Sequence, residues 1–220
     1  MPEERIFFDG EVDHTDQAIA YLGSYHRTSY GGCKPGPGDM VIGASSLVAK
    51  ANGVAHASHV QEKLTEMVQL NEVLYACGLA ASMKGFRLPA GVWCSDLLLA
   101  NLCKLNVTRS PYLLARLATD LAGGIMVTMP SAADFDHGEI GPLVRKYLTA
   151  APALSVEQRR RLMRFLENVA LGCGGVCLLA ESVHGACSPQ AQVMQIRADA
   201  PFEEMERCVR TLLASAPVGN

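Results

Sequence analysis

Four side chains that can perform acid–base, metal-binding or nucleophilic chemistry fall within nine consecutive positions of the chain, namely His26, Tyr30, Cys33 and Lys34. His26 and Tyr30 are four residues apart, so on a helix they share a face. The pair Gly31-Gly32 is expected to end that helix and to fold the chain so that Cys33 approaches the same point. A thiolate close to an imidazole suits an iron–sulfur cluster, a zinc ion or nucleophilic catalysis.

Two interpretations of this cluster remain open from the residue pattern. In the first, His26 and Cys33 bind a metal or act in catalysis. In the second, the segment is an ordinary helix end with a hydrogen-bonded histidine and a buried thiol. Two ligands do not complete a tetrahedral metal site, and no second CxxC or HxxxH motif supplies the others with convincing geometry.

A second dense group is the segment ESVHGACSPQ, from Glu181 to Gln190. Glu181 and His184 are three residues apart at the end of an apolar helix, which indicates an acid–base pair. Ser188 precedes Pro189, so we expect Ser188 to be the N-cap of a following helix whose first amides can hold a pyrophosphate. The alternative is a simple joint between two helices.

Two further patterns are weaker. Gly123-Gly124 breaks a helix, and its amides can face a phosphate, although such a pair more often marks close helix contact. Cys173 and Cys177 share a helical face among apolar residues, which favours core packing. Most of the eight cysteines are expected to be reduced core residues, with Cys33 and Cys187 as exceptions because they lie in Gly/Pro-rich turns.

The elements that must position these groups are predicted to be helices. Only 6% of the residues are aromatic, and alanine and leucine are abundant, which favours close helix packing. A first helix is expected to begin near Asp13 or Thr15, with Ile19, Leu22 and either Tyr25 or His26 on its apolar face. The other helices are predicted at about 39–51, 57–83, 95–122 with a break at Ser110-Pro111, 141–148, 155–183, 189–198 and 202–214.

The segments between them are predicted to be irregular. Residues 33–39 (CKPGPGD) indicate a rigid loop, 88–93 a connection, and 128–142 a loop with one helical turn, whereas Ile6–Phe8 suggests a short extended segment. No repeat or linker divides the chain. We therefore expect an all-α antiparallel helical bundle that forms a single domain over residues 1–220, with 1–12 as a lead-in.

Composition and charge exclude several classes of protein. With 49% apolar and 19% charged residues, the 220-residue chain can bury a core and is not a disordered tail. A net charge of −3 argues against a nucleic-acid partner. Uninterrupted apolar runs are too short to cross a bilayer, and the acidic N-terminal segment lacks an apolar signal region. A cytoplasmic protein without membrane association is expected.

Several motifs, in the same order along the chain, resemble one family. LARLATDLAGGIMVTMPSAADF (114–135), KYL (146–148) and ESVHGACSPQAQ (181–192) are similar to the C-terminal domain of the 4-hydroxyphenylacetate 3-hydroxylase/4-hydroxybutyryl-CoA dehydratase family. PEERIFFDGE (2–11) resembles the segment that leads into that domain. The resemblance implies a bundle like the C-terminal domain of acyl-CoA dehydrogenases, bound FAD and a homotetramer.

Within the family, His26 and Cys33 match the iron-ligand pair of the dehydratase branch, and Tyr30 and Lys34 match its active-site tyrosine and lysine. The monooxygenase branch has no such cluster. The resemblance therefore implies a [4Fe-4S] cluster and the conversion of 4-hydroxybutyryl-CoA to crotonyl-CoA, with isomerisation of vinylacetyl-CoA.

The resemblance also implies roles for individual residues. His26 would remove the β-proton of the acyl-CoA substrate, while Tyr30 and Lys34 would position or protonate the leaving hydroxyl group. Glu181 is a further candidate catalytic residue. The candidate flavin-binding residues lie at helix ends, where the bundle of one subunit reaches the FAD of its neighbour, and are Gly123, Gly124, Ser188 and Gln190.

This sequence also departs from the family. Family members are about twice as long, and their N-terminal domains bring the other two cluster cysteines and much of the flavin site, so we expect a fragment or a subunit with a separate N-terminal chain. The family motif HGAGSP is HGACSP here, with Cys187 in place of a glycine. Two alternatives remain, a component of a flavin-dependent aromatic hydroxylase without metal at His26 and Cys33, and a non-catalytic helical domain for subunit association.

Overall fold

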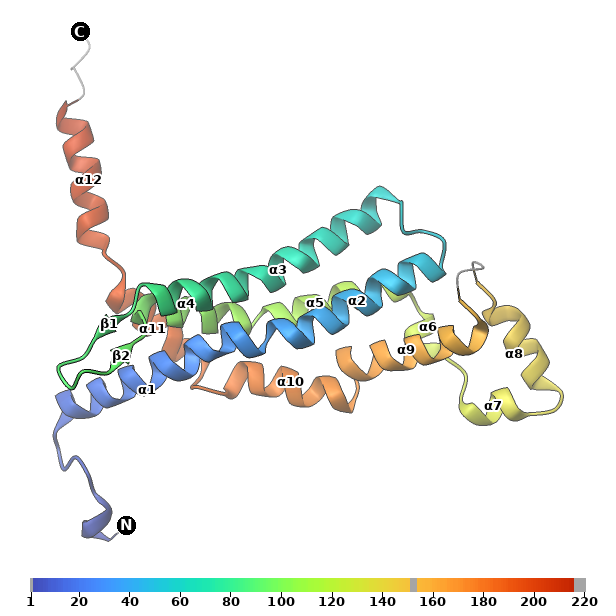
Figure 1. The fold of residues 1–220 in the computed structure, drawn as a ribbon, viewed down its shortest axis with the longest axis horizontal. Coiled ribbons are helices and arrows are strands. Elements are labelled where there is room, and N and C mark those ends of the chain that lie inside the picture. Colours follow the sequence, from blue (N-terminus) through green and yellow to red (C-terminus); the bar gives the residue numbers. More distant parts are fainter. Residues whose placement is uncertain (1, 151–153, 216–220) are drawn as a thin grey trace.

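The computed structural model describes residues 2–150 and 154–215, and its helices form four antiparallel rods (Figure 1). The α1 and α2 rod packs against α3 and against the rod of α4 and α5, and α9 packs against α2 and α5. The predicted all-α bundle is confirmed. The rods consist of α1 (Val12–Cys33) and α2 (Pro35–Ala51), α3 (Ser58–Met83), α4 (Leu97–Val107) and α5 (Ser110–Ala122), and α9 (Val156–Ala170) and α10 (Cys173–His184).

The remaining described elements lie at the two ends of the bundle (Figure 1). A short 3-10 helix (Glu3–Arg5) leads into α1, and α11 packs on α4, while α12 projects away from the rods. Strands β1 (Phe86–Arg87) and β2 (Trp93–Cys94) form a small antiparallel hairpin. The other helices are α6 (Ile125–Thr128), α7 (Ala132–Asp136), α8 (Ile140–Leu148), α11 (Pro189–Asp199) and α12 (Phe202–Ser215).

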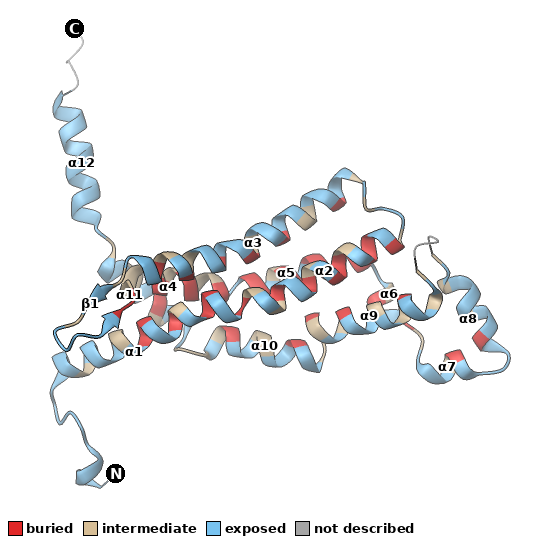
Figure 2. Cartoon of the chain, viewed as in Figure 1, coloured by how far each residue is buried: buried red, intermediate tan, exposed pale blue. Residues whose placement is uncertain are grey.

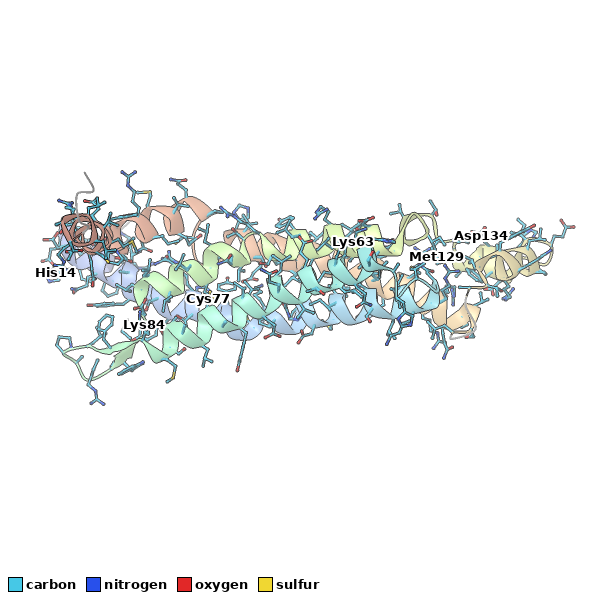
Figure 3. All side chains as sticks on the ribbon, turned by 90° about the horizontal axis from the view of Figure 1, so that it is seen from above. His14, Lys63, Cys77, Lys84, Met129 and Asp134 are labelled. Carbon is cyan, nitrogen blue, oxygen red and sulfur yellow. The ribbon has the colours of Figure 1, made fainter. Side chains whose placement is uncertain are left out.

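Buried residues occur along the whole length of the rods (Figure 2), but the two ends differ in the types of residue that are buried. At the end formed by α2, α5, α6 and α9, called the apolar end, the core is mainly aliphatic and includes Met126, Met163 and Leu166. At the end formed by α1, α4, α11 and the last turn of α10, called the polar end, Arg27, Tyr30 and Lys104 are among the largest fully buried side chains. Figure 3 shows Cys77 of α3 toward the polar end and Met129 toward the apolar end.

The predicted loop at residues 33–39 is wrong, because α1 runs through Gly31-Gly32 and α2 begins at Pro35. A Cβ atom on Gly31 would lie 2.6 Å from the Cα atom of Gly78 on α3. The glycine therefore permits close contact between two helices instead of ending one. Proline suits the first turn of a helix, because the amide that it lacks has no partner there, and α2 can start immediately after Lys34.

The predicted single helix over 155–183 is also wrong. It is divided into α9 and α10 by Leu171 and Gly172. The side chain of Asn168 accepts a hydrogen bond from the amide of Gly174 at 3.2 Å, which offers the backbone a partner outside the regular helical ladder. As a result of this break, α10 does not continue along the line of α9 (Figure 1).

Further corrections concern which faces are buried. The predicted core thiols Cys173 and Cys177 are exposed, as is Cys208, because the outer face of α10 and all of α12 lack covering elements in the described chain. Leu22, predicted to face inward on α1, is 70% exposed, while the polar residues Ser24 and Arg27 are buried. Ser24, Arg27 and Tyr30 follow helical spacing on the face that meets α3 and α4.

The structure also tests three local predictions outside the helix interiors. Of the predicted extended segment Ile6–Phe8, only Ile6 has extended backbone angles, whereas Phe7 and Phe8 form bends, and all three side chains are exposed. The connection at 88–93 lies inside the β1–β2 hairpin, where Gly91 has a φ of +82°, a conformation that glycine adopts without strain. The break at Ser110-Pro111 is confirmed as the start of α5.

Among the described residues, one stretch is long and apolar enough, by length and composition alone, to cross a membrane. It covers Val156–Asp199 and contains an 18-residue window with a mean hydropathy of 1.5, of which 22% is buried. A single stretch of this kind is weak evidence for a membrane span, because helices of bundles have the same composition. In this chain α9 packs against α2 and α5 as part of the bundle.

Candidate functional site

Tyr30, Lys34 and Glu181 meet at the polar end of the bundle. The Tyr30 hydroxyl donates a hydrogen bond to one carboxylate oxygen of Glu181, and the Lys34 ammonium forms an ion pair with the other oxygen. Tyr30 is 2% exposed and Lys34 8% exposed, whereas about half of the Glu181 side chain is exposed. The three residues thus form a phenol–carboxylate–ammonium group that is buried on one side and open on the other.

The local structure explains this convergence. Because α1 continues through Gly31-Gly32, Tyr30 and Lys34 are one helical turn apart and project from the same face. Glu181 arrives from the last turn of α10, one turn before Gly185. A Cβ atom on Gly185 would collide with the Tyr30 hydroxyl, so the glycine leaves the space that the phenol occupies.

His26 and Cys33 lie beside this group. The imidazole of His26 stacks on the Tyr30 ring, with 5.4 Å between centroids and 20° between the planes. Both His26 and Cys33 are exposed, and their spacing of seven residues on α1 places them two turns apart on one face. The alternative interpretation of Cys33 as a buried thiol is therefore wrong, and both donors are accessible to a ligand.

The described residues do not by themselves form a metal site. Over residues 2–150 and 154–215 there is no group of three or more His, Cys, Asp or Glu side chains that could hold a metal ion. His26 and Cys33 fit the soft sulfur and imidazole donors that an iron–sulfur cluster uses. They fit as part of a ligand set, and any further ligands would have to come from elsewhere.

Two buried cations complete the site and were not predicted from the sequence. Lys104 of α4 is 0% exposed, and its ammonium lies 4.8 Å from the centroid of the Tyr30 ring and donates to the carbonyl of Ser182. Arg27 of α1 donates to side-chain oxygens of Asn101 and Gln195 and, at 3.3 Å, to the carbonyl of Ala186. The sequence could have indicated that Lys104 is buried, because Lys104 lies one turn after Ala100 on the apolar face of α4.

Burial shifts the pKa of the ionisable groups in the direction of their neutral forms. It raises the pKa of the Tyr30 phenol, and the nearby Cys33 thiol adds to that shift. It lowers the pKa of Lys34, although Cys33 opposes the shift. Burial, together with the positive charges of Lys34 and Arg27, lowers the pKa of Lys104 to about 8. The site therefore holds its positive charge at an energetic cost.

The loop between α10 and α11 borders the same site. Ala186 and Cys187 have φ values of +56° and +76°, which are unusual for residues other than glycine. The side-chain amide of Gln192 donates to the carbonyl of Ala186 at 3.1 Å, and Arg27 donates to the same carbonyl. His184 is exposed at the end of α10, and no hydrogen bond among the described residues joins it to Glu181. The predicted Glu181–His184 pair is thus replaced by Glu181 with Tyr30 and Lys34.

A comparison with known protein families shows which family this chain belongs to. Residues 15–214 match the profile described as 4-hydroxyphenylacetate 3-hydroxylase C terminal. The chain belongs to this family. The match covers every residue of the site described above and confirms the resemblance that the sequence motifs indicated.

Relatives of this family member carry two different activities. It is 51% identical over 204 residues to the 4-hydroxybutyryl-CoA dehydratase/vinylacetyl-CoA-Delta-isomerase of Clostridium aminobutyricum, covering 89% of this chain and 42% of that protein. It is 26% identical over 178 residues to the 4-hydroxyphenylacetate 3-monooxygenase oxygenase component of Thermus thermophilus, covering 78% of this chain and 36% of that protein. The chain spans less than half the length of these curated relatives.

Solved structures agree with the fold. An oxygen-tolerant archaeal 4-hydroxybutyryl-CoA dehydratase from N. maritimus superposes with a TM-score of 0.87 at 42% identity, covering 100% of this chain and 44% of that chain. The oxygenase component of a 4-hydroxyphenylacetate 3-monooxygenase, complexed with FAD and 4-hydroxyphenylacetate, gives a TM-score of 0.83 at 22% identity, covering 97% of this chain and 45% of that chain. At that identity the second match shows the fold alone.

The residues predicted to bind flavin are not brought together within this family member. Gly123 and Gly124 lie between α5 and α6, at the apolar end, whereas Ser188 and Gln190 lie at the start of α11, at the polar end (Figure 1). All four are exposed. Ser188 is the N-cap residue of α11 but makes no side-chain capping bond, so its predicted position is confirmed and its capping role is not.

Proposed function

We propose that this chain forms the C-terminal part of a 4-hydroxybutyryl-CoA dehydratase/vinylacetyl-CoA isomerase. The observation that carries the proposal is the convergence of Tyr30, Lys34 and Glu181 next to two exposed donors, His26 and Cys33, on one face of α1. The 51% identity to a relative of that activity supports it. The rest of the enzyme would lie outside this chain, since the relatives are about twice as long.

The three central residues suit the removal of a hydroxyl group from an acyl-CoA. The Tyr30 phenol can donate a proton to the departing oxygen, and the Lys34 ammonium can orient that oxygen or stabilise its negative charge. Glu181 accepts a hydrogen bond from Tyr30 and pairs with Lys34, so it holds both donors in one arrangement. His26 would also be an iron ligand, so its exposed imidazole would release the iron before it acts as the base that removes the β-proton.

His26 and Cys33 would hold one edge of a [4Fe-4S] cluster, with two cysteine ligands supplied by the N-terminal part of the enzyme. When bound, the cluster would supply Lewis-acid chemistry for the substrate hydroxyl. The accessible sulfur and nitrogen donors on one helical face are the feature of this chain that fits the cluster. Cluster binding by the chain alone should be weak, because affinity depends on a complete ligand set.

FAD would be held at helix ends of the bundle. The start of α11, with Ser188 and Gln190, fits a pyrophosphate better than Gly123-Gly124, because α11 presents uncapped amides at the beginning of an eleven-residue helix whereas α6 has only four residues. The two pairs lie too far apart along the bundle to serve one flavin in one subunit (Figure 1). In an oligomer they would contact different flavins.

Self-association into a homotetramer in the cytoplasm is part of the same proposal. No described residue covers the outer face of α10, where Val176 is 57% exposed, and α12 carries Phe202, Met205, Val209 and Leu212 on its surface. Surfaces of this kind usually mark contacts with another chain. A subunit neighbour or the N-terminal part of the enzyme would cover them.

Reconstitution with the N-terminal part of a relative tests this proposal. The complex should bind iron and flavin and should convert 4-hydroxybutyryl-CoA to crotonyl-CoA. Cys33→Ala should abolish the bound iron, whereas the matched control Cys177→Ala, also an exposed cysteine on a helix, should leave it unchanged. His26→Gln should reduce turnover more than iron content, and Glu181→Gln should reduce turnover with iron retained.

The outcomes separate the alternatives. Wild-type iron content and turnover in both the Cys33 and His26 variants would contradict the dehydratase proposal. Hydroxylation of a phenol by a flavin-loaded, iron-free complex would support the aromatic hydroxylase instead. A complex that assembles but binds neither cofactor would support the third alternative, a non-catalytic helical domain for subunit association.

A further inference from the structure

Asn71 is a buried polar side chain that the proposed chemistry does not use. It lies on α3 and is 1% exposed. Its side-chain amide donates to the carbonyl of Pro35 at 3.0 Å and to the carboxylate of Asp39 at 2.8 Å. Both acceptors lie near the start of α2, and over residues 2–150 and 154–215 no other side chain of α3 hydrogen-bonds to α2. Asn71 thus ties the middle of α3 to the start of α2.

Two residues of the site lie at the place where α1 passes into α2, called the α1–α2 joint (residues 33–35). Cys33 is the last residue of α1, Lys34 follows it, and α2 begins at Pro35. Lys34 keeps helical backbone angles, with a φ of −82° and a ψ of −31°, so no loop separates the two helices. The positions of the Lys34 ammonium and the Cys33 thiol therefore depend on how α1 and α2 meet.

Local structure holds the α1–α2 joint weakly. Pro35 and Pro37 have no amide hydrogen, so two carbonyls in the last turn of α1 lack their regular helical donors. No described side chain caps the start of α2. The packing beside the joint is also incomplete, because a cavity of about 20 Å³ lies there, lined in part by Lys34 and Asn71. A contact from another helix is needed to fix the joint.

The chain provides space on α2 for this contact. A Cβ atom on Gly38 would collide with Oδ1 of Asn71, so glycine is the residue that admits the amide here. Glycine is otherwise unfavourable inside a helix. A Cβ atom on Gly36, in the same turn, would meet no atom within 4 Å. The two glycines therefore differ in that Gly38 alone is matched to Asn71.

We propose that Asn71 is a positioning residue, because its amide fixes the α1–α2 joint and thereby sets where the Lys34 ammonium and the Cys33 thiol lie. The proposal rests on the function proposed above, in which Lys34 orients the departing oxygen and Cys33 binds iron. Asn71 is buried and acts through the backbone of Pro35, which directly follows Lys34. Its effect on the reaction is therefore one of geometry.

The first measurement is amide hydrogen exchange, read by NMR at one fixed pH in the intact 220-residue chain. The amides of Lys34 and Gly38 report on the joint, because they donate to the carbonyls of Tyr30 and Lys34. Asn71→Leu removes both donors to α2 at similar size, so these amides should exchange about tenfold faster. The control Asn106→Leu, in which the lost amide bonded only within α4, should leave their exchange unchanged.

A second pair of variants reaches the same contact from α2. Gly38→Ala adds the methyl group that displaces Asn71, so it should also speed exchange at Lys34, although alanine favours helix formation. Gly36→Ala, the matched change with open space around it, should not speed that exchange. Exchange at Lys34 that stays at the wild-type rate in both Asn71→Leu and Gly38→Ala would overturn the proposal. If one of these two variants does not fold, the other decides.

The complex reconstituted with the N-terminal part of a relative shows whether the joint matters for the chemistry. In Asn71→Leu, kcat per bound iron should fall by roughly tenfold to a hundredfold while the KM for 4-hydroxybutyryl-CoA changes little. The electron paramagnetic resonance spectrum of the reduced cluster should also change, because Cys33 would be its ligand. A residue with a merely structural role would lower the amount of assembled enzyme but not kcat per bound iron.

The two measurements separate this proposal from the proposed function. An active complex in which Asn71→Leu leaves both kcat per bound iron and the spectrum unchanged would overturn the positioning role. An inactive wild-type complex would contradict the dehydratase function instead. Amide exchange needs no substrate, cofactor or partner chain, so it would still decide whether Asn71 fixes the α1–α2 joint.

Discussion

At the apolar end of the bundle, Met126, Met163 and Leu166 are 0% exposed and belong to one aliphatic cluster that joins α2, α5 and α9. At the polar end, Arg27 and Lys104 are equally buried, but their partners are oxygen atoms of side chains and backbone. Burial of apolar surface stabilises the fold by about 25 cal/mol for each Å², whereas burial of a charge costs free energy unless it is fully compensated.

This difference assigns separate tasks to the two ends of the same bundle. Burial at the apolar end stabilises the fold. This stabilisation offsets the free-energy cost of holding cations, a phenol and a carboxylate close together at the polar end. Proteins commonly keep such energetically unfavourable groups where they act on ligands. The predictions below compare substitutions at the two ends, from the largest expected effect to the smallest.

The largest effect is expected from a cavity at the apolar end. Leu166→Ala should lower the free energy of unfolding by about 2–5 kcal/mol, because a buried leucine loses its contacts and the space does not fully close. Leu74→Ala, a matched substitution in the smaller cluster around Tyr30, should cost less. Urea unfolding of both variants measures the difference. An equal or larger loss of free energy of unfolding in Leu74→Ala would contradict the conclusion that the apolar end contributes more stability.

At the polar end, removal of a charge should stabilise the protein. The pKa of Lys104 is lowered from 10.5 to about 8, so below about pH 8 the folded state carries a buried ammonium that the unfolded state would keep in water. Lys104→Met should therefore raise the free energy of unfolding at neutral pH, by at most on the order of 3 kcal/mol, less the lost hydrogen bond to Ser182.

The pH dependence gives the sign of this effect. As pH rises from about 8 to about 10.5, the folded wild type loses the Lys104 proton before the unfolded chain does, so the wild type gains stability relative to Lys104→Met. The advantage of the variant should be complete below pH 8 and should disappear by about pH 10.5. A variant that is less stable than the wild type by a constant amount across this range would show that Lys104 is not an energetic cost.

A smaller loss is expected when the site loses one hydrogen bond. Tyr30→Phe removes the donor to Glu181 but leaves the Lys34–Glu181 ion pair, so the free energy of unfolding should fall by about 1 kcal/mol. Tyr25→Phe removes an exposed hydrogen bond to the carbonyl of Trp93, 2.7 Å long, and should cost less than half of that. Thermal unfolding of the two variants provides the measurement, and equal losses would argue against a tightly held site.

The smallest effect concerns backbone strain beside the site. Cys187 has a φ of +76°, a region in which glycine has no steric penalty, so Cys187→Gly should raise the free energy of unfolding by about 0.5–1 kcal/mol. The control Cys177→Gly places glycine inside α10 and should lower it by about 1 kcal/mol. Calorimetry that shows the same sign for both variants would contradict the role given to this loop.

The sequence by itself determined that the chain is mainly helical, and it located some of the helices. Apolar residues at helical spacing predicted α3, and Ser110-Pro111 predicted the start of α5, since local propensity and proline geometry act within one turn. Residue types and motif resemblance also indicated His26, Tyr30, Lys34 and Glu181 as candidate site residues. These features depend on neighbours along the chain or on motifs that can be read without knowledge of contacts.

Only the tertiary structure decided which faces are buried and which groups meet. Gly31-Gly32 has the composition of a helix end, yet Gly31 lies inside α1 because Gly78 of α3 needs the space that a side chain would fill. Cys173 and Cys177 have apolar neighbours but no helix of this chain covers their face in the described residues. Lys104 and Tyr30 are 74 positions apart, and their contact exists because α1 and α4 pack side by side. Such contacts depend on the packing of whole rods, and periodicity within one helix does not encode them.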